Sequence, residues 1–406
     1  MGARLAAGAR ILETALRPLV PAETREGAAV DWRLISGVAL LALASRLIIV
    51  VSIVVGAAMR ELTEIRPLPL LAAGNLRRVL DSVVTYGDFA WYASTVQQGY
   101  FAGAFDRTVQ TNLAFFPLQG WLIAAITDPV ARLAFSGAMF ALGLAFFVGF
   151  ALRFVDRATT LFAVALICFW PGSFALTQFR AESVMFACLA AALYFACRRQ
   201  LLPLLLACLL AGFAKPNGIL IFVAAAPFLL STPEGGVRLD APALMRLALL
   251  GLACVAGPVA MSVLCWIHVG EPLAWAQNQT AWGASFDRPL EQLDQLFSAP
   301  MLVGRWGWDL ELFNTFAAAL CLVAIVMLAR TRHWALAVYL FLYAAMTYVN
   351  FGTWIFMRHL STALPMFLAL GMVRAPVAQH VLLAILVAVA ALTVALGGAG
   401  YIPAWS

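Results

Sequence analysis

Long apolar runs separated by short polar turns dominate this chain of 406 residues. The first run, Leu34 to Ala58, is about 25 residues long, which suits a transmembrane helix and exceeds the apolar region of a signal peptide. Ten later runs predict further spans, at 130–152, 159–177, 183–197, 201–214, 219–230, 244–268, 312–329, 334–349, 360–373 and 377–396. The pattern predicts an all-α, polytopic membrane bundle of about 11 spans.

One further apolar segment, 115–126, contains Pro117 and is too short to span, so we expect an interfacial or re-entrant helix there. If it does not cross, every short basic turn falls on the side of the N-terminus. These turns hold Arg153, Arg157, Arg198, Arg199, Arg238, Arg246, Arg330, Arg332 and Arg374. The positive-inside rule then places the N-terminus in the cytoplasm and the C-terminus outside, in the plasma (inner) membrane.

The turns divide the chain into a short tail and one domain. Residues 1–33 form a charged cytoplasmic segment, in which 3–19 could be an amphipathic surface helix or a partly ordered tail. Residues 34–406 form a single transmembrane domain with two large outward loops. The first loop, 59–129, would carry juxtamembrane helices, and the second is 269–311.

The composition agrees with this prediction. The chain is 64% hydrophobic and 11% charged, with a mean hydropathy of +0.92, and it has too few charges to cover a soluble surface. Lys215 is the one lysine among 26 basic residues, and the arginines form no stripe that would indicate nucleic acid. The seven cysteines lie in apolar runs without a C-x-x-C pair, so we expect neither disulfides nor a metal site. No glycine-rich phosphate loop indicates ATP or a dinucleotide, so no cofactor is predicted.

The unusual polar residues gather on the outward side. Asp88 begins an aromatic stretch, where its carboxylate could accept a proton from a hydroxyl or simply cap the following helix. The nearby Trp91 and Tyr92 suit an interfacial belt or a wall on which a sugar stacks.

Cations and a second carboxylate lie at the outer ends of later spans. Arg180 and Glu182 could form a structural ion pair, and charges so close to hydrocarbon usually have a partner or a function. Lys215 precedes a helix-breaking turn, where it could hold a phosphate or extend to the interface. Arg358 and His359 open a late span, and this arginine could form a phosphate fork or an interfacial anchor.

The outward face thus combines a carboxylate, several cations and many aromatic residues, and the chain has no nucleotide motif. This combination predicts group transfer from a lipid-linked phosphate. Two alternatives stay open at this point. A transporter or flippase of an amphipathic lipid or solute would place polar residues near the middle of the membrane. A non-catalytic membrane scaffold would have no outward-facing site.

Six segments, in this order, resemble the PIG-V-like mannosyltransferases of the GT-C glycosyltransferase class, relatives of the enzyme that adds the second mannose in GPI-anchor assembly. They are 87–92 (GDFAWY), 112–118 (NLAFFPL), 169–183 (FWPGSFALTQFRAES), 215–218 (KPNG), 271–283 (EPLAWAQNQTAWG) and 358–365 (RHLSTALP). The resemblance covers about residues 80–370. The chain departs from the family pattern at Gly87, where tryptophan is usual, at the pair Phe179-Arg180, and at Lys215, where arginine is usual.

The resemblance implies an inverting, metal-independent transfer of a hexose, mannose in that family. The donor would be a polyprenyl-phosphate sugar, the acceptor a lipid or glycan of the cell envelope, and membrane lipids would surround the protein. Asp88 would be the catalytic base, and Lys215 or Arg358 would stabilise the phosphate leaving group. Glu182 would orient the acceptor or pair with Arg180. The other residues of the matching segments that would bind substrate are Trp91, Tyr92, Asn112, Arg180, Asn217 and His359.

Overall fold

A computed structural model of the chain describes residues 31–63, 88–232, 236–282, 311–351 and 356–398. Within these ranges every regular element is helical, which confirms the predicted all-α class, and one isolated bridge joins Ser231 to Val237. The α-helices are α2 (Trp32–Thr63), α4 (Phe89–Gln97), α5 (Pro117–Ala125), α6 (Pro129–Ala151), α7 (Arg157–Phe169), α8 (Ala181–Cys197), α9 (Leu201–Ala214), α10 (Ile221–Leu230), α11 (Ala241–Val269), α12 (Ala274–Gln277), α14 (Glu311–Arg330), α15 (Trp334–Phe351), α16 (Phe356–Leu360), α17 (Leu364–Gly371) and α18 (Pro376–Gly398). The 3-10 helices are η2 (Asn112–Ala114), η3 (Pro171–Leu176), η4 (Pro216–Leu220) and η5 (Asn278–Trp282). The predicted N-terminal segment up to residue 30, and residues 64–87 and 283–310 of the two predicted loops, lie outside the described ranges.

Five described helices are long and apolar enough to cross a membrane: α2, α6, α11, α14 and α18. Their outer faces are apolar; in α2, for example, Leu40, Leu43 and Leu47 are 64–70% exposed. Large apolar side chains exposed along whole helices suit contact with lipid chains and not with water. The protein is therefore a helical membrane protein. Several other apolar helices are shorter than a span, and the total of eleven spans stays a prediction.

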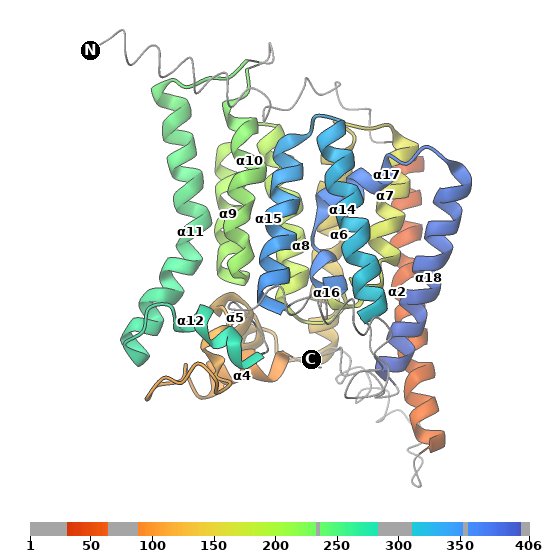
Figure 1. Cartoon of the computed structure of the whole chain (residues 1–406). Coiled ribbons are helices and arrows are strands. Elements are labelled where there is room, and N and C mark those ends of the chain that lie inside the picture. Colours follow the sequence, from red (N-terminus) through yellow and green to blue (C-terminus); the bar gives the residue numbers. More distant parts are fainter. Residues whose placement is uncertain (1–30, 64–87, 233–235, 283–310, 352–355, 399–406) are drawn as a thin grey trace.

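The helices run between two ends of the molecule (Figure 1). One end, which we call the basic end, holds the arginine-bearing turns from which the topology is predicted. These turns are 152–156, 198–200, 331–333 and 372–375. The short helices α4, α5, α12 and α16 lie at the other end, the site end (Figure 1). Helix α5 covers most of the apolar segment 115–126, and its nine residues extend about 13 Å, less than half the hydrocarbon thickness.

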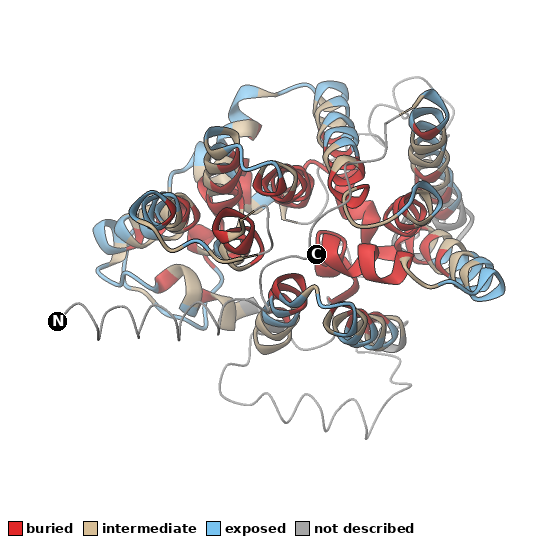
Figure 2. Cartoon of the chain, turned by 90° about the horizontal axis from the view of Figure 1, so that it is seen from above, coloured by how far each residue is buried: buried red, intermediate tan, exposed pale blue. Residues whose placement is uncertain are grey.

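Helix α8 forms the centre of the core. It is buried on almost every face, and it packs against α6, α9 and α10. The contact with α6 is close because Gly143 leaves room for the Phe186 ring, which would lie 2.3 Å from an added Cβ. Seen along the helices, buried residues face the interior of the arrangement and exposed residues face outward (Figure 2). The first turn of α8 is thereby held rigidly at the site end.

Candidate functional site

Four helix boundaries meet at the site end, and each supplies charged side chains. Asp88 occupies the position before α4, and Lys215 ends α9. Arg180 and Glu182 lie at the start of α8, and Arg358 lies in the five-residue helix α16. Prolines at the start of η3, η4 and α17 explain why the helices break here, since proline cannot continue a helix but fits its first turn.

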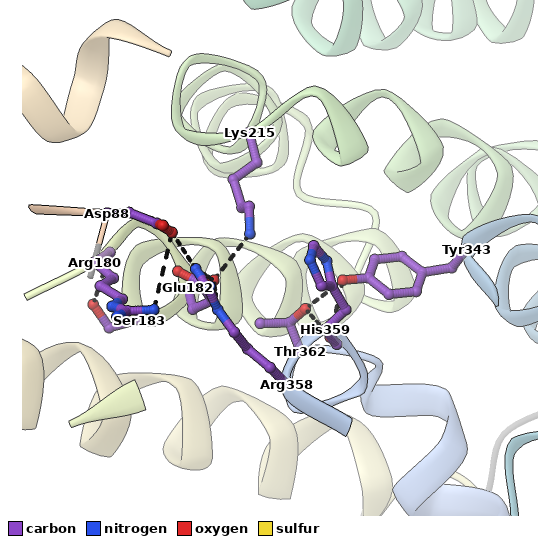
Figure 3. Close-up of polar contacts among 9 residues, drawn as sticks. All are labelled: Asp88, Arg180, Glu182, Ser183, Lys215, Tyr343, Arg358, His359 and Thr362. Carbon is purple, nitrogen blue, oxygen red and sulfur yellow. Dashed lines mark hydrogen bonds and ion pairs between the residues drawn. The ribbon is translucent and has the colours of Figure 1, made fainter. Parts of the chain in front are cut away.

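These five side chains form one charge cluster (Figure 3). The Arg358 guanidinium lies between the two carboxylates: its Nε donates to Glu182 Oε1 at 2.8 Å, and its Nη2 contacts both Glu182 Oε1, at 2.7 Å, and Asp88 Oδ2. Lys215 Nζ lies 3.1 Å from Glu182 Oε1. Arg180 Nη1 lies 3.9 Å from Asp88 Oδ2. Residues separated by up to 270 positions in sequence are thus joined directly.

The cluster carries one more positive than negative charge and is shielded from solvent. The side chains of Arg180, Glu182 and Arg358 are 0%, 2% and 9% exposed, whereas those of Lys215 and Asp88 are 16% and 19% exposed. The accessible edge of the cluster is therefore formed by one amine and one carboxylate. Three cations against two anions in a poorly solvated place favour the binding of an anion.

The pKa of Asp88 reflects these neighbours. Burial alone would raise the pKa of this carboxyl, but the positive charges of Arg358 and Arg180 outweigh it, so the pKa lies below its usual value of 3.8. Asp88 is therefore ionised at neutral pH and is a weak base while Arg358 remains bound to it.

The backbone beneath Arg358 is fixed by three contacts to the preceding residue. The Trp170 indole Nε1 donates to the Met357 carbonyl at 2.7 Å, and Met357 N donates to Asn314 Oδ1 at 2.8 Å. Gly172 approaches the same peptide so closely that a Cβ there would lie 2.1 Å from the Met357 oxygen. These contacts determine where the Arg358 guanidinium can reach.

Arg46, in the middle of α2, makes polar contacts around η3 that the sequence analysis did not predict. Its guanidinium donates to the carbonyls of Cys168 at 3.2 Å and Ser173 at 3.0 Å, and to the Thr177 hydroxyl at 2.6 Å. It also lies 4.2 Å from the centre of the Phe140 ring. Arg46 thus holds η3, which carries the contacts to Met357 and leads to α8. An arginine inside a 25-residue apolar run is the signal that could have identified it.

The contacts in the charge cluster bear on the alternatives predicted for Asp88, Glu182 and Lys215. Asp88 makes no side-chain capping bond to α4, so the alternative that it merely caps this helix is wrong. Glu182 pairs with Arg358 and Lys215, which was not among the pairings considered from the sequence. Lys215 is 16% exposed and pairs with Glu182, so its amine is directed into the cluster.

The predicted aromatic wall lies beside the cluster but is packed. Trp91 stacks on Phe115 with ring centroids 5.9 Å apart, and Tyr92 meets the same ring edge-on at 4.9 Å. Tyr92 is buried, whereas Trp91 is half-buried. Only Trp91 therefore keeps a substantial exposed surface for a ligand.

Asn112, predicted to bind substrate, makes its hydrogen bonds within the first loop. Its amide nitrogen donates to the Gly99 carbonyl at 2.9 Å and to the Ser94 hydroxyl at 3.1 Å, and its oxygen accepts from Phe101 N at 2.8 Å. The side chain is used within the loop and is not gathered with Asp88.

Asn217 and His359 lie on the far side of the cluster, near Tyr343. The Tyr343 hydroxyl donates to the His359 carbonyl at 3.0 Å and lies 2.8 Å from the Thr362 hydroxyl (Figure 3). Asn217 lies beside the same hydroxyl. This group joins α15, η4 and the turn between α16 and α17, and so supports the segment that carries Arg358.

In the part of the chain that the structure describes, no three His, Cys, Asp or Glu side chains form a group that could hold a metal ion. No protein-family model, no curated protein and no solved structure matches this chain.

Proposed function

We propose that the protein is a membrane glycosyltransferase that moves a hexose, mannose by the family resemblance, from a polyprenyl-phosphate donor to a hydroxyl of a lipid or glycan acceptor. The observation that carries this proposal is the charge cluster: a partly exposed carboxylate directly beside a buried excess of positive charge. The ordered sequence segments that resemble the PIG-V-like family supply the same residues.

The donor phosphate would bind at the cationic edge. Lys215 is the most exposed cation of the cluster, and Arg358 contacts the same Glu182 oxygen and lies against the partly exposed Asp88, where its guanidinium could bind two phosphate oxygens. A phosphate that binds the Arg358 guanidinium competes with Asp88 for the same N–H donors. Donor binding therefore frees the Asp88 carboxylate, and its pKa rises when its strongest cationic neighbour is shared with the phosphate.

The freed carboxylate then acts as the general base. The acceptor hydroxyl oxygen attacks C1 of the hexose, and its proton passes to Asp88 as the new glycosidic bond forms. The C1–O bond to the phosphate breaks, and the leaving polyprenyl phosphate keeps the electron pair, with its negative charge stabilised by Lys215 and Arg358. Glu182 holds both cations in place throughout, because its carboxylate contacts each of them.

The topology that goes with this function has eleven spans, a cytoplasmic N-terminus and the site end facing outward from the plasma membrane. The arginine-bearing turns at the opposite end support that orientation under the positive-inside rule. Nucleotide-linked sugars are absent from the outer side, where a lipid-linked donor is the available activated sugar.

The test uses the purified full-length chain in lipid vesicles, a polyprenyl-phosphate mannose with a radiolabelled sugar, and a membrane lipid extract as acceptor. We expect labelled product from the wild type and from Asp106→Asn, a control that alters an exposed acid of the same loop, paired with Thr108. Asp88→Asn should lower the rate at least about 100-fold, the scale of general-base catalysis. Full activity of Asp88→Asn would refute the assigned base. Movement of the labelled lipid across the vesicle without any glycosidic product would favour a flippase.

A further inference from the structure

A second feature lies at the basic end, far from the charge cluster. A groove of about 760 Å³ runs between α2, α6 and the C-terminal part of α8. Its walls are apolar: Leu34 and Val38 from α2 face Leu144 and Val148 from α6. The volume lies within the range of about 300–1,000 Å³ that is typical of pockets for small ligands.

The groove opens sideways toward the lipid-facing surface. Ile35 lines it and is 47% exposed, and the small residues Ala39, Ala141 and Ala145 keep its floor wide. A ligand can therefore enter from the hydrocarbon region without moving a helix. This access suits an acyl chain.

Two arginines close the groove at the basic end. Arg153 and Arg198 both line it. The Nε of Arg153 is buried without a hydrogen-bond partner, and the Arg198 guanidinium lies 4.7 Å from the centre of the Tyr194 ring. Among the described residues neither arginine has a carboxylate partner, in contrast to the adjacent Arg157, which pairs with Asp31 at 2.6 Å. A buried guanidinium N–H without a partner is costly, and Arg198 beside it is exposed, so an anion bound here would meet one buried and one accessible positive charge.

We infer that this groove binds an anionic phospholipid, with an acyl chain between α2 and α6 and the phosphate at Arg153 and Arg198. The apolar walls match the acyl chain of such a lipid, and the two arginines match its phosphate. Basic pockets between membrane helices are known sites for anionic headgroups. An anionic headgroup is favoured over a zwitterionic one, whose own amine would be repelled by two guanidinium groups. The inference does not depend on the proposed transfer reaction.

The bound lipid would fill the space between α2 and the rest of the bundle. Helix α2 carries Arg46, which holds η3 below the charge cluster. A ligand that binds only the folded form stabilises it by mass action. We therefore expect the lipid to raise the thermal stability of the whole protein.

The experiment measures lipid retention by native mass spectrometry and thermal unfolding of the full chain in mild detergent. Phosphatidylglycerol and phosphatidylcholine with identical acyl chains are compared, and glycerol phosphate serves as the headgroup without a tail. The wild type should retain phosphatidylglycerol at least about tenfold better than phosphatidylcholine and should unfold at a higher temperature with it. Glycerol phosphate should give no shift, because it lacks the chain that fills the groove.

Two variants and one control complete the test. Arg153→Gln with Arg198→Gln should remove the preference for phosphatidylglycerol. Ala145→Phe should block the groove and weaken both lipids while leaving the arginines in place. The control, Arg330→Gln with Arg374→Gln, removes the same charge from the same end at exposed residues outside the groove lining and should behave as the wild type. Equal retention of the two lipids by the wild type, or an equal loss in the control pair, would overturn the inference. A glycerol phosphate shift equal to that of phosphatidylglycerol would also overturn it, since the site would then bind a free phosphate.

Discussion

Gly172→Ala tests whether the backbone contact beneath Arg358 determines the position of the charge cluster. The added Cβ would lie 2.1 Å from the Met357 oxygen, 2.6 Å from the Met357 carbonyl carbon and 2.8 Å from the Arg358 Cα. All three atoms belong to the backbone, so no side-chain rotation relieves the clash. The Met357 oxygen must move by about 1.3 Å to reach 3.4 Å, where ordinary van der Waals contact begins.

That displacement passes directly to the Arg358 guanidinium, whose contacts to both carboxylates are at hydrogen-bond distance. A misplacement of about 1 Å from a change away from the chemistry can lower a rate about 100-fold, and overpacking a core lowers stability by about 1–3 kcal/mol. We therefore expect a fall of about 100-fold in sugar transfer, together with a lower unfolding temperature.

The matched control is Gly137→Ala in α6, where an added Cβ meets no atom within 4 Å. Alanine is the better helix former, so this variant should keep full activity and unfold at the wild-type temperature or slightly above it. Transfer assays and thermal unfolding in detergent are measured on both. If Gly172→Ala keeps both the activity and the stability of the wild type, the reasoning from the close approach is refuted.

Three other predictions concern the buried charges. Glu182→Gln leaves two cations without their shared carboxylate, so it should lower the free energy of unfolding by about 3–5 kcal/mol. Chemical denaturation measures this loss, and a loss no larger than that of Asp88→Asn would contradict the prediction. Arg46→Ala should lower both the stability of the protein and the rate of sugar transfer, because hydrogen bonds to charged groups each contribute about 1.5–3 kcal/mol. The control Arg33→Ala, at an exposed position of the same helix, should change neither. The pKa of Asp88 is lowered in the folded protein, so its contribution to stability is complete above its unfolded pKa and is lost as the pH falls through 3.8 toward the folded pKa. The stability difference between the wild type and Asp88→Asn should therefore be constant above about pH 5 and shrink in more acidic solution, and a difference that grows with acid would contradict the sign of the shift.

The sequence predicted the helical class well because apolar runs and basic turns are local patterns. The turns at Arg153, Arg198 and Arg330 do lie at one end, and the short segment 115–126 does contain a helix too short to span. The number of spans and the GT-C class stay predictions, since helix length alone leaves the shorter helices undecided.

The members of the candidate site were also predictable, but their pairing was not. Asp88, Glu182, Lys215 and Arg358 were each notable as charges beside hydrocarbon. Which carboxylate meets which cation depends on how α16 packs against η3, and this contact joins segments far apart in the chain. The hydrogen-bond partners of Asn112 were unpredictable for a related reason, because they lie on neighbouring turns of its own loop and a motif does not show them.

The sequence separations within the charge cluster impose an order on its assembly during synthesis. Glu182 and Lys215 are 33 residues apart, so this pair can form once the first α8–α9 hairpin has emerged. Arg358 follows Glu182 by 176 residues and Asp88 by 270, so the bridge between the two carboxylates is completed only when the last helices are made. Lys215 can therefore pair with the Glu182 carboxylate before Arg358, the second partner of Glu182, has been synthesised. Within the cluster, the single lysine of the chain is therefore the contact of Glu182 that synthesis makes available first.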